Sequence, residues 1–175
     1  LLGHYMNEVT IIQEPKVMTY GSLKMGLVPW MDDQNDKQCL DFLANAKCDW
    51  IGGHFDIVGY EMLNGIKCEH GLDRSIFKRF EQVLSGHFHT KSSQDNITYL
   101  GSQFEMNWSD AHNDKFFHVL DTETREIEAI QNPYTLHHRI YYDDSKQDYL
   151  HYNLDDVENK FVKVVVINKS DSFTF

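Results

Sequence analysis

The sequence is poor in the features that mark several special classes of protein. Its 175 residues include three prolines, ten glycines and three cysteines, a composition that excludes collagen-like, low-complexity and disulfide-rich chains. The longest strongly apolar run is Val164–Ile167, far shorter than the ~20 residues of a membrane helix. No basic start leads into an apolar segment of the kind that signal peptides carry. We therefore predict a soluble, cytoplasmic protein with no membrane partner.

Positive charge is also scarce, and cysteine lacks the spacing of a metal site. Sixteen Lys and Arg residues face 27 Asp and Glu residues, which gives a net charge of −11. Because this mean field repels phosphate, contact with DNA would require a local basic patch, a metal ion or a partner subunit. Cys39, Cys48 and Cys68 form no C-x-x-C pair, so we expect free, mostly buried thiols and no Cys₄ zinc site.

The hydrophobic pattern predicts an α/β (α+β) chain in which strands alternate with helices and then give way to antiparallel strands. Helices are expected from Asp36 to Ala46 and from Asp73 to about Gln82. Strands are expected at 8–13 and 17–20 around a turn, and then at 23–28, 50–53, 83–86, 97–100, 116–120, 127–130, 136–142 and 161–167. The polar segment 143–156 is the expected linker, so we divide the chain into residues 1–142 and residues 143–175.

Three histidines follow two of the buried strands. His87 and His89 come after Gly86 at the end of one strand, and His54 comes after Gly53 at the end of another. Strands joined by a helical crossover are often parallel neighbours, so their carboxyl ends should meet at one crevice. Neutral imidazole is the commonest metal ligand in proteins. The pattern thus indicates a metal site at His54, His87 and His89, with solvated loop histidines as the alternative.

Other polar and aromatic residues carry weaker signals. His70 lies in a glycine-bounded loop, where a substrate-binding role is the functional interpretation. His137 and His138 fall in a strand, which favours a structural role for them. Loop acids such as Asp110 need no catalytic explanation, and Trp30 and Trp108 are expected to pack in the core or at its rim. A cupin-type metal site is excluded because residues 90–93, just after the His-x-His pair, contain no glutamate, and no later histidine follows a Pro-Gly turn.

Several short segments, taken together, resemble a known family. Gly86–His89 is similar to the Gly-His-x-His signature that closes calcineurin-like metallophosphoesterase domains. The segments of residues 27–31, 71–73, 85–90, 99–102, 121–124 and 138–140 resemble SbcD-type nuclease subunits of phage recombination complexes. The likeness extends over residues 23–142, and its motifs come in the family's order.

The resemblance implies a two-metal phosphodiesterase, usually manganese-dependent, that trims DNA ends together with an SbcC-type ATPase. The fold would be the C-terminal half of a phosphoesterase β-sandwich flanked by helices, followed by the start of a capping domain. By analogy, His54 and His87 would hold one ion and His89 the other.

Part of the family pattern is missing from the start of this sequence. The family also needs an N-terminal Asp-x-His, a Gly-Asp that bridges the ions and a Gly-Asn-His-Asp/Glu with the general acid, and none of these precedes His54. We therefore expect an incomplete and inactive piece of a nuclease, with no catalytic residue of its own. Its open sheet edges also predict self-association, for example as a homodimer. The alternative is a non-catalytic module that binds DNA ends or assists assembly.

Overall fold

The computed structural model describes residues 9–63 and 65–170 and shows a mixed α+β protein built mostly of strands. Its largest element is a six-stranded sheet in the order β1-β2-β3-β6-β8-β7. The strands are β1 (Lys16–Tyr20), β2 (Leu23–Leu27), β3 (Trp50–Gly53), β6 (Gln82–Ser85), β7 (Ser92–Gln94) and β8 (Ile97–Tyr99). The four central strands β2, β3, β6 and β8 run parallel to one another, and the edge strands β1 and β7 are antiparallel to their neighbours.

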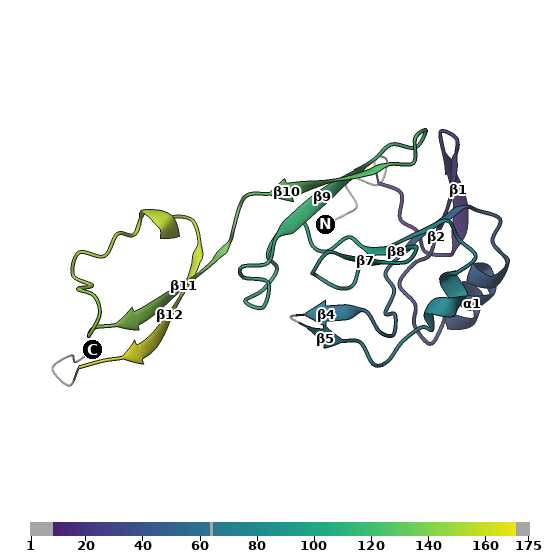
Figure 1. Ribbon diagram of the computed structural model, residues 1–175. Coiled ribbons are helices and arrows are strands. Elements are labelled where there is room, and N and C mark those ends of the chain that lie inside the picture. The colour runs from purple at the N-terminus through teal and green to yellow at the C-terminus, as the bar shows by residue number, and fades with distance from the viewer. Residues whose placement is uncertain (1–8, 64, 171–175) are drawn as a thin grey trace.

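Both faces of this sheet are covered, because successive residues of a strand point to opposite faces. On one face, Ile51 and Val83 pack with the helix α1 (Asp36–Asn45) in the larger hydrophobic cluster. On the other face, Trp50 and Leu84 pack against Leu120 at the end of a β-hairpin. That hairpin joins β9 (Lys115–Leu120) to β10 (Ile127–Asn132), and Figure 1 shows it on a different side of the sheet from α1.

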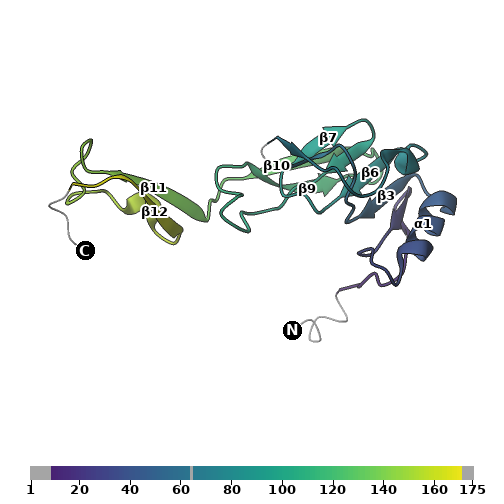
Figure 2. The same ribbon diagram turned by 90° about the horizontal axis from the view of Figure 1, so that it is seen from below.

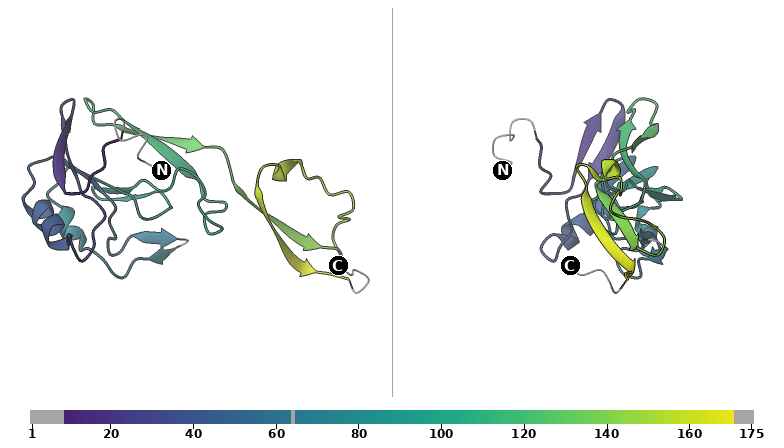
Figure 3. Two further views of the ribbon diagram at one scale, coloured as in Figure 1. Left: turned by 180° about the vertical axis from the view of Figure 1, so that it is seen from behind. Right: turned by 90° about the vertical axis from the view of Figure 1, so that its left-hand side faces the viewer.

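The remaining strands form two small pairs. The strands β4 (Glu61–Leu63) and β5 (Ile66–Lys67) make a short antiparallel ribbon after β3. The strands β11 (His137–Asp143) and β12 (Phe161–Asn168) pair in parallel. Figures 2 and 3 show this last pair at the far end of an elongated molecule, beyond the β9–β10 hairpin. Many apolar side chains of β12 are exposed, among them Phe161, Val164 and Ile167.

Most of the expected elements are confirmed. The helix at α1, the strands at β2, β3, β6 and β8, and the β9–β10 hairpin all lie within a few residues of their predicted bounds. The expected parallel arrangement of β3 and β6 is also confirmed. Asp36 lies in the first turn of α1 and Asn35 takes the cap position, one residue earlier than predicted. Within residues 9–63 and 65–170, no helix is long and apolar enough to cross a membrane.

The predicted helix from Asp73 to Gln82 is wrong. Only a single 3₁₀ turn forms, at Arg74–Phe77, capped by the Asp73 carboxylate, which accepts the Ser75 N–H at 2.7 Å. The carbonyls of Phe77 and Phe80, which a longer helix would have used, accept hydrogen bonds from the Asn96 side chain instead. Pairing with β3 then draws the chain into β6 from Gln82 onward. Tertiary contacts thus override a helical pattern of apolar residues.

Two strand predictions also need correction. No strand forms over residues 9–13, and residue 8 lies outside the described residues. The turn comes later, at Gly21 and Ser22 between β1 and β2, where Gly21 has φ +59°. The expected all-antiparallel ending differs as well, because β8 is parallel to β6 and β11 is parallel to β12. The chain from residue 144 to residue 160 connects β11 to β12, and the domain boundary at 142/143 stays a prediction.

Candidate metal site at the ends of β3 and β6

The carboxyl ends of β3 and β6 lie side by side at the centre of the sheet. Gly53 pairs with Ser85, and the Gly86 N–H donates to the Gly53 carbonyl at 3.0 Å, which extends the pairing past both strands. The buried Ser85 hydroxyl then accepts the Phe55 N–H at 3.0 Å. These bonds fix the two segments that carry His54 and His87 beside each other. A Cβ at residue 86 would lie 2.8 Å from His54 Nδ1, so glycine at this position leaves room for the His54 ring as it stands.

The structure brings the three predicted histidines to one cavity. His54, His87 and His89 all line a hollow of about 480 Å³. The rings of His54 and His87 are 5.2 Å apart and nearly perpendicular. A second cavity, of about 260 Å³, adjoins it on the side of Trp30 and is lined by His54 and His87 but not by His89. His54 and His87 are therefore shared by the two hollows.

The environments of His54 and His87 differ. Partial burial, and then the nearby imidazoles of His87 and His89, lower the pKa of His54, which favours the neutral ring that a metal requires. His87 has φ +84°, a left-handed backbone that is rare for a residue other than glycine. Its Nε2 lies 4.0 Å from Asp56 Oδ1, too far for a hydrogen bond. Asp56 Oδ1 instead accepts a hydrogen bond from the Cys68 thiol at 2.8 Å.

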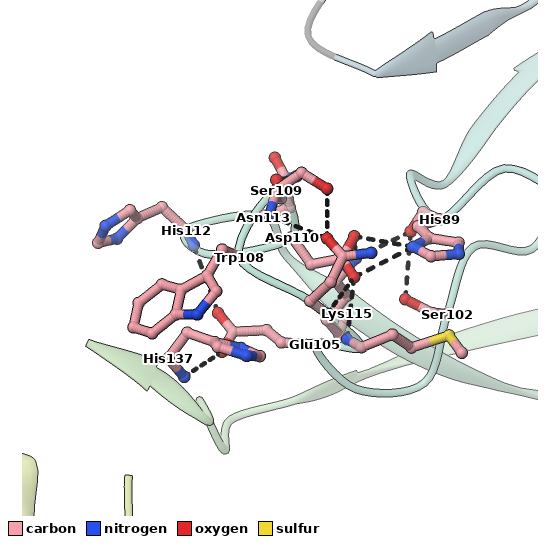
Figure 4. A network of polar contacts seen from close by, with 12 residues as sticks. His89, Ser102, Glu105, Trp108, Ser109, Asp110, His112, Asn113, Lys115 and His137 are labelled. Carbon is pink, nitrogen blue, oxygen red and sulfur yellow. Dashed lines mark hydrogen bonds and ion pairs between the residues drawn. The ribbon is translucent and has the colours of Figure 1, made fainter. Parts of the chain in front are cut away.

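His89 is held by a buried carboxylate from another segment. Its Nδ1 lies 3.1 Å from both Oδ1 and Oδ2 of Asp110, which is fully buried. Lys115, also buried, donates to Asp110 Oδ1 at 3.2 Å and to the His89 carbonyl at 3.0 Å. Burial raises the pKa of Asp110, but hydrogen bonds from the Met106 N–H and from Lys115 lower it more, so the carboxyl titrates below its usual range. Figure 4 shows this network around His89.

A second buried carboxylate lies in the same loop but serves a structural purpose. Glu105 accepts the N–H groups of Leu136 and His137, each at 2.7 Å, and that of His112 at 3.3 Å. His137 Nδ1 lies 3.3 Å from the same carboxylate, and the His137 ring packs on the ring of Trp108. Figure 4 shows this group beside the one that holds His89. The structural interpretation of His137 fits its place at the start of β11.

The donors present fit only part of a metal centre. Three imidazoles share one cavity, and they suit divalent transition metals. In the described part of the chain, however, no three or more His, Cys, Asp or Glu side chains are close enough to hold one ion. A pair of divalent ions also needs a carboxylate between them, and Asp110 is already occupied by Lys115 and the loop backbone. The chain therefore offers imidazole ligands without a complete ligand set.

The other residues singled out in the sequence do not share one site. His70 is exposed and lines neither cavity of the histidines, so its substrate role stays a prediction. Trp30 is 58% exposed, with its ring 4.9 Å from that of His54, so it lies on the rim and not in the core. Cys39, Cys48 and Cys68 are free thiols, as expected, and burial raises the pKa of each.

Sequence reasoning missed Asp110 and Lys115. Asp110 was interpreted as an ordinary loop acid, yet it is among the most buried side chains of the protein and contacts His89, 21 residues away. The one available signal was the Asp-x-His pattern of Asp110–His112, which has the family's spacing at a different place in the chain. The Asp110 carboxylate contacts Lys115 and His89. His112 contributes only its backbone N–H, which donates to Glu105.

Two known proteins that are similar to this chain are both named as subunits of nucleases. The chain is 31% identical to exonuclease subunit 1 of Enterobacteria phage T4 over 175 residues, which is 99% of this chain and 50% of that protein. It is 27% identical to the SbcD subunit of the nuclease SbcCD from Staphylococcus epidermidis over 149 residues, which is 70% of this chain and 40% of that protein. The chain thus spans half or less of the length of these relatives. No family model matches it.

Proposed function

Because the chain is a homologue of SbcD-type nuclease subunits, we propose that it is part of a metal-dependent DNA nuclease. The reaction would be hydrolysis of phosphodiester bonds during recombination or the processing of DNA ends. We also assign the covered sheet to the C-terminal half of a calcineurin-like phosphoesterase sandwich. In support of this assignment, the sheet carries α1 on one face and the β9–β10 hairpin on the other.

One observation carries the proposal. His54, His87 and His89 follow two adjacent parallel strands and line one cavity in a chain related to nucleases along 99% of its length. In our assignment, His54 and His87 bind one Mn²⁺ ion and His89 binds a second. When bound, such ions would lower the pKa of a water molecule and stabilise negative charge on the phosphate oxygens.

The protein's own residues would prepare this site. Gly86 lets the segment after β6 lie close to His54, and Ser85 holds the backbone after His54. The depressed pKa of His54 keeps its ring able to bind a cation at neutral pH. Bridging carboxylates and a general acid would come from outside this 175-residue chain. The isolated 175-residue chain is therefore expected to be inactive.

The charge of the chain shapes its expected partners. With a net charge of −11, the chain does not attract the DNA backbone by its mean field, so a local basic patch, bound cations or a partner would supply the attraction. Both relatives are themselves subunits of nucleases. We propose that the partner here is an SbcC-type ATPase.

The direct test is an assay of DNA cleavage. The product of the complete reading frame that encodes this chain would be incubated with linear DNA and Mn²⁺, with and without a chelator. We expect metal-dependent cleavage that falls in His87→Asn by at least the roughly 10- to 100-fold that the loss of an outer-shell partner costs, because asparagine tolerates the left-handed backbone but removes the imidazole. His151→Asn is the matched control, because the His151 side chain is 87% exposed and lies on the β11–β12 connection. Cleavage that survives both His87→Asn and the chelator would refute the proposal.

A second candidate is a module that binds DNA ends or assists assembly without catalysis. It is favoured by the incomplete ligand set in the described residues. A measurement of binding to DNA ends beside the same cleavage assay separates the two functions: a non-catalytic module would bind DNA ends and cleave under no metal condition.

A further inference from the structure

The His89–Asp110–Lys115 chain of contacts has a consequence for how His89 binds a cation. An ionised carboxylate only accepts hydrogen bonds, so the His89 nitrogen that faces it must carry the proton. That nitrogen is Nδ1, at 3.1 Å from both oxygens of Asp110. The lone pair of the neutral ring is then on Nε2, on the edge of the ring opposite Asp110. Residues that orient a ligating histidine in this way set both its tautomer and its direction.

Asp110 is itself fixed through both of its oxygens. Its Oδ2 accepts the N–H groups of Met106 at 2.9 Å and Asn107 at 3.2 Å, and its Oδ1 accepts Lys115 Nζ at 3.2 Å. Lys115 also donates to the His89 carbonyl at 3.0 Å. The buried Lys115 ammonium therefore links the Asp110 carboxylate to the backbone of His89. The start of β9 and the loop before it are thereby locked to the segment after β6.

The other two predicted ligands have different surroundings. The Asp56 carboxylate lies 4.0 Å from His87, and its side chain is 46% exposed. His54 contacts the rings of Trp30 and His87. Of the three histidines, His89 alone has a buried carboxylate at hydrogen-bond distance among the described residues.

We propose that Asp110, anchored by Lys115, is a positioning residue that holds His89 in the Nδ1-protonated tautomer, with Nε2 presented to a divalent cation in the histidine cavity. This inference rests on the proposed function for its cation, but its statement about the tautomer does not. It also assigns a role to Lys115, which neutralises Asp110 without touching the cavity. The alternative is an ion pair that only stabilises the fold.

The test uses the product of the complete reading frame and begins without metal. Long-range ¹H–¹⁵N spectra of the histidine rings report which nitrogen carries the proton, and His89→Gln assigns the His89 signals. We expect His89 to be protonated at Nδ1 in the wild-type protein and to lose this fixed tautomer in Asp110→Asn. An Nε2-protonated His89 in the wild-type protein would overturn the proposal, and this measurement requires no variant of Asp110 to fold.

The second measurement is the affinity for Mn²⁺ by calorimetry. Asp110→Asn should weaken binding by about 10- to 100-fold, the usual effect of losing a residue that orients a ligand. Glu105→Gln is the matched control, since Glu105 is also buried in the same loop but contacts His137 and not His89. Equal affinity in Asp110→Asn and the wild type would contradict the positioning role. An Nδ1-protonated His89 in a protein that binds no Mn²⁺ would instead contradict the proposed function and leave the tautomer assignment standing.

Discussion

The Tyr99 hydroxyl bonds to the backbone on both sides of Asp56: it donates to the Phe55 carbonyl at 3.0 Å and accepts the Ile57 N–H at 3.1 Å. Tyr99 is the last residue of β8 and is fully buried, and burial raises the pKa of its hydroxyl. The loop that follows His54 is therefore attached to a strand two places away in the sheet. This contact gives the candidate site a rigid base.

Removal of this hydroxyl should destabilise the protein. Tyr99→Phe leaves the buried Ile57 N–H without its acceptor, and we expect the free energy of unfolding to fall by about 1–3 kcal/mol. Urea denaturation measures the change. Tyr134→Phe removes a hydroxyl from a side chain that is 79% exposed and should change stability little. Equal stability of the two variants would show that the Tyr99 bonds contribute nothing.

Glu105 predicts how stability depends on pH. Burial raises the pKa of Glu105, but the bonds from the N–H groups of His137 and Leu136 lower it more, so its folded pKa lies below the usual value. The unfolded chain therefore takes up this proton at a higher pH than the folded protein does. Its stabilisation is complete above the unfolded pKa of about 4.3 and is lost as pH falls through the folded value.

Glu105→Gln should therefore lower the free energy of unfolding at pH 7 and flatten its decline as pH falls below about 5. Urea titrations at a series of pH values measure both effects. The exposed Glu128 provides the control, and Glu128→Gln should follow the wild-type curve. A Glu105→Gln curve parallel to that of the wild type would contradict the account.

Gly86 should be sensitive to a single methyl group. A Cβ at this position would lie 2.8 Å from His54 Nδ1, so Gly86→Ala must displace the His54 ring. Because a side-chain ring can shift, we expect a stability cost of about 1 kcal/mol or less but a clear change in the ring signals of His54 by NMR. Ser102→Ala, on the wall of the same cavity, should leave those signals in place. Unchanged His54 signals in Gly86→Ala would disprove the close contact.

The exposed side chains of β12 predict self-association of the 175-residue chain. Val164 and Ile167 are 55% and 59% exposed on a two-stranded sheet, and an open apolar strand favours pairing with a second copy. Light scattering should detect dimers or larger species whose mass falls in a Val164→Lys, Ile167→Lys double variant. Tyr134→Lys is the control for added charge. A monomeric wild-type chain at all concentrations would exclude this surface as an interface.

The sequence predicted those elements of the fold that depend on the local pattern of apolar and polar residues. The apolar spacing of α1 and the strand–glycine–histidine pattern of β3 and β6 were sufficient, because burial and chain direction determine these elements. The pattern at residues 73–82 misled, since the Asn96 side chain and pairing with β3 decide the outcome there. Neither contact can be predicted from the sequence of residues 73–82 itself.

The three histidines of the site could be predicted from the sequence, but the residues that hold His89 could not. Glycine before histidine at two strand ends indicated His54, His87 and His89, but Asp110 and Lys115 approach His89 through long-range folding of the loop before β9. The sequence around an acidic residue in a polar loop does not show whether its side chain is solvated or fully buried. Burial of Asp110 becomes visible only once β9 packs on the sheet.

The central claim is that this chain supplies imidazole ligands to a pair of Mn²⁺ ions, and that carboxylates from outside the 175-residue chain complete the site. Electron paramagnetic resonance counts bound Mn²⁺ ions directly. The account predicts two ions per molecule for the product of the complete reading frame, fewer for its His87→Asn variant, and no tight site in the 175-residue chain alone. Two tight ions in the isolated chain, or undiminished binding in the His87→Asn variant, would contradict it.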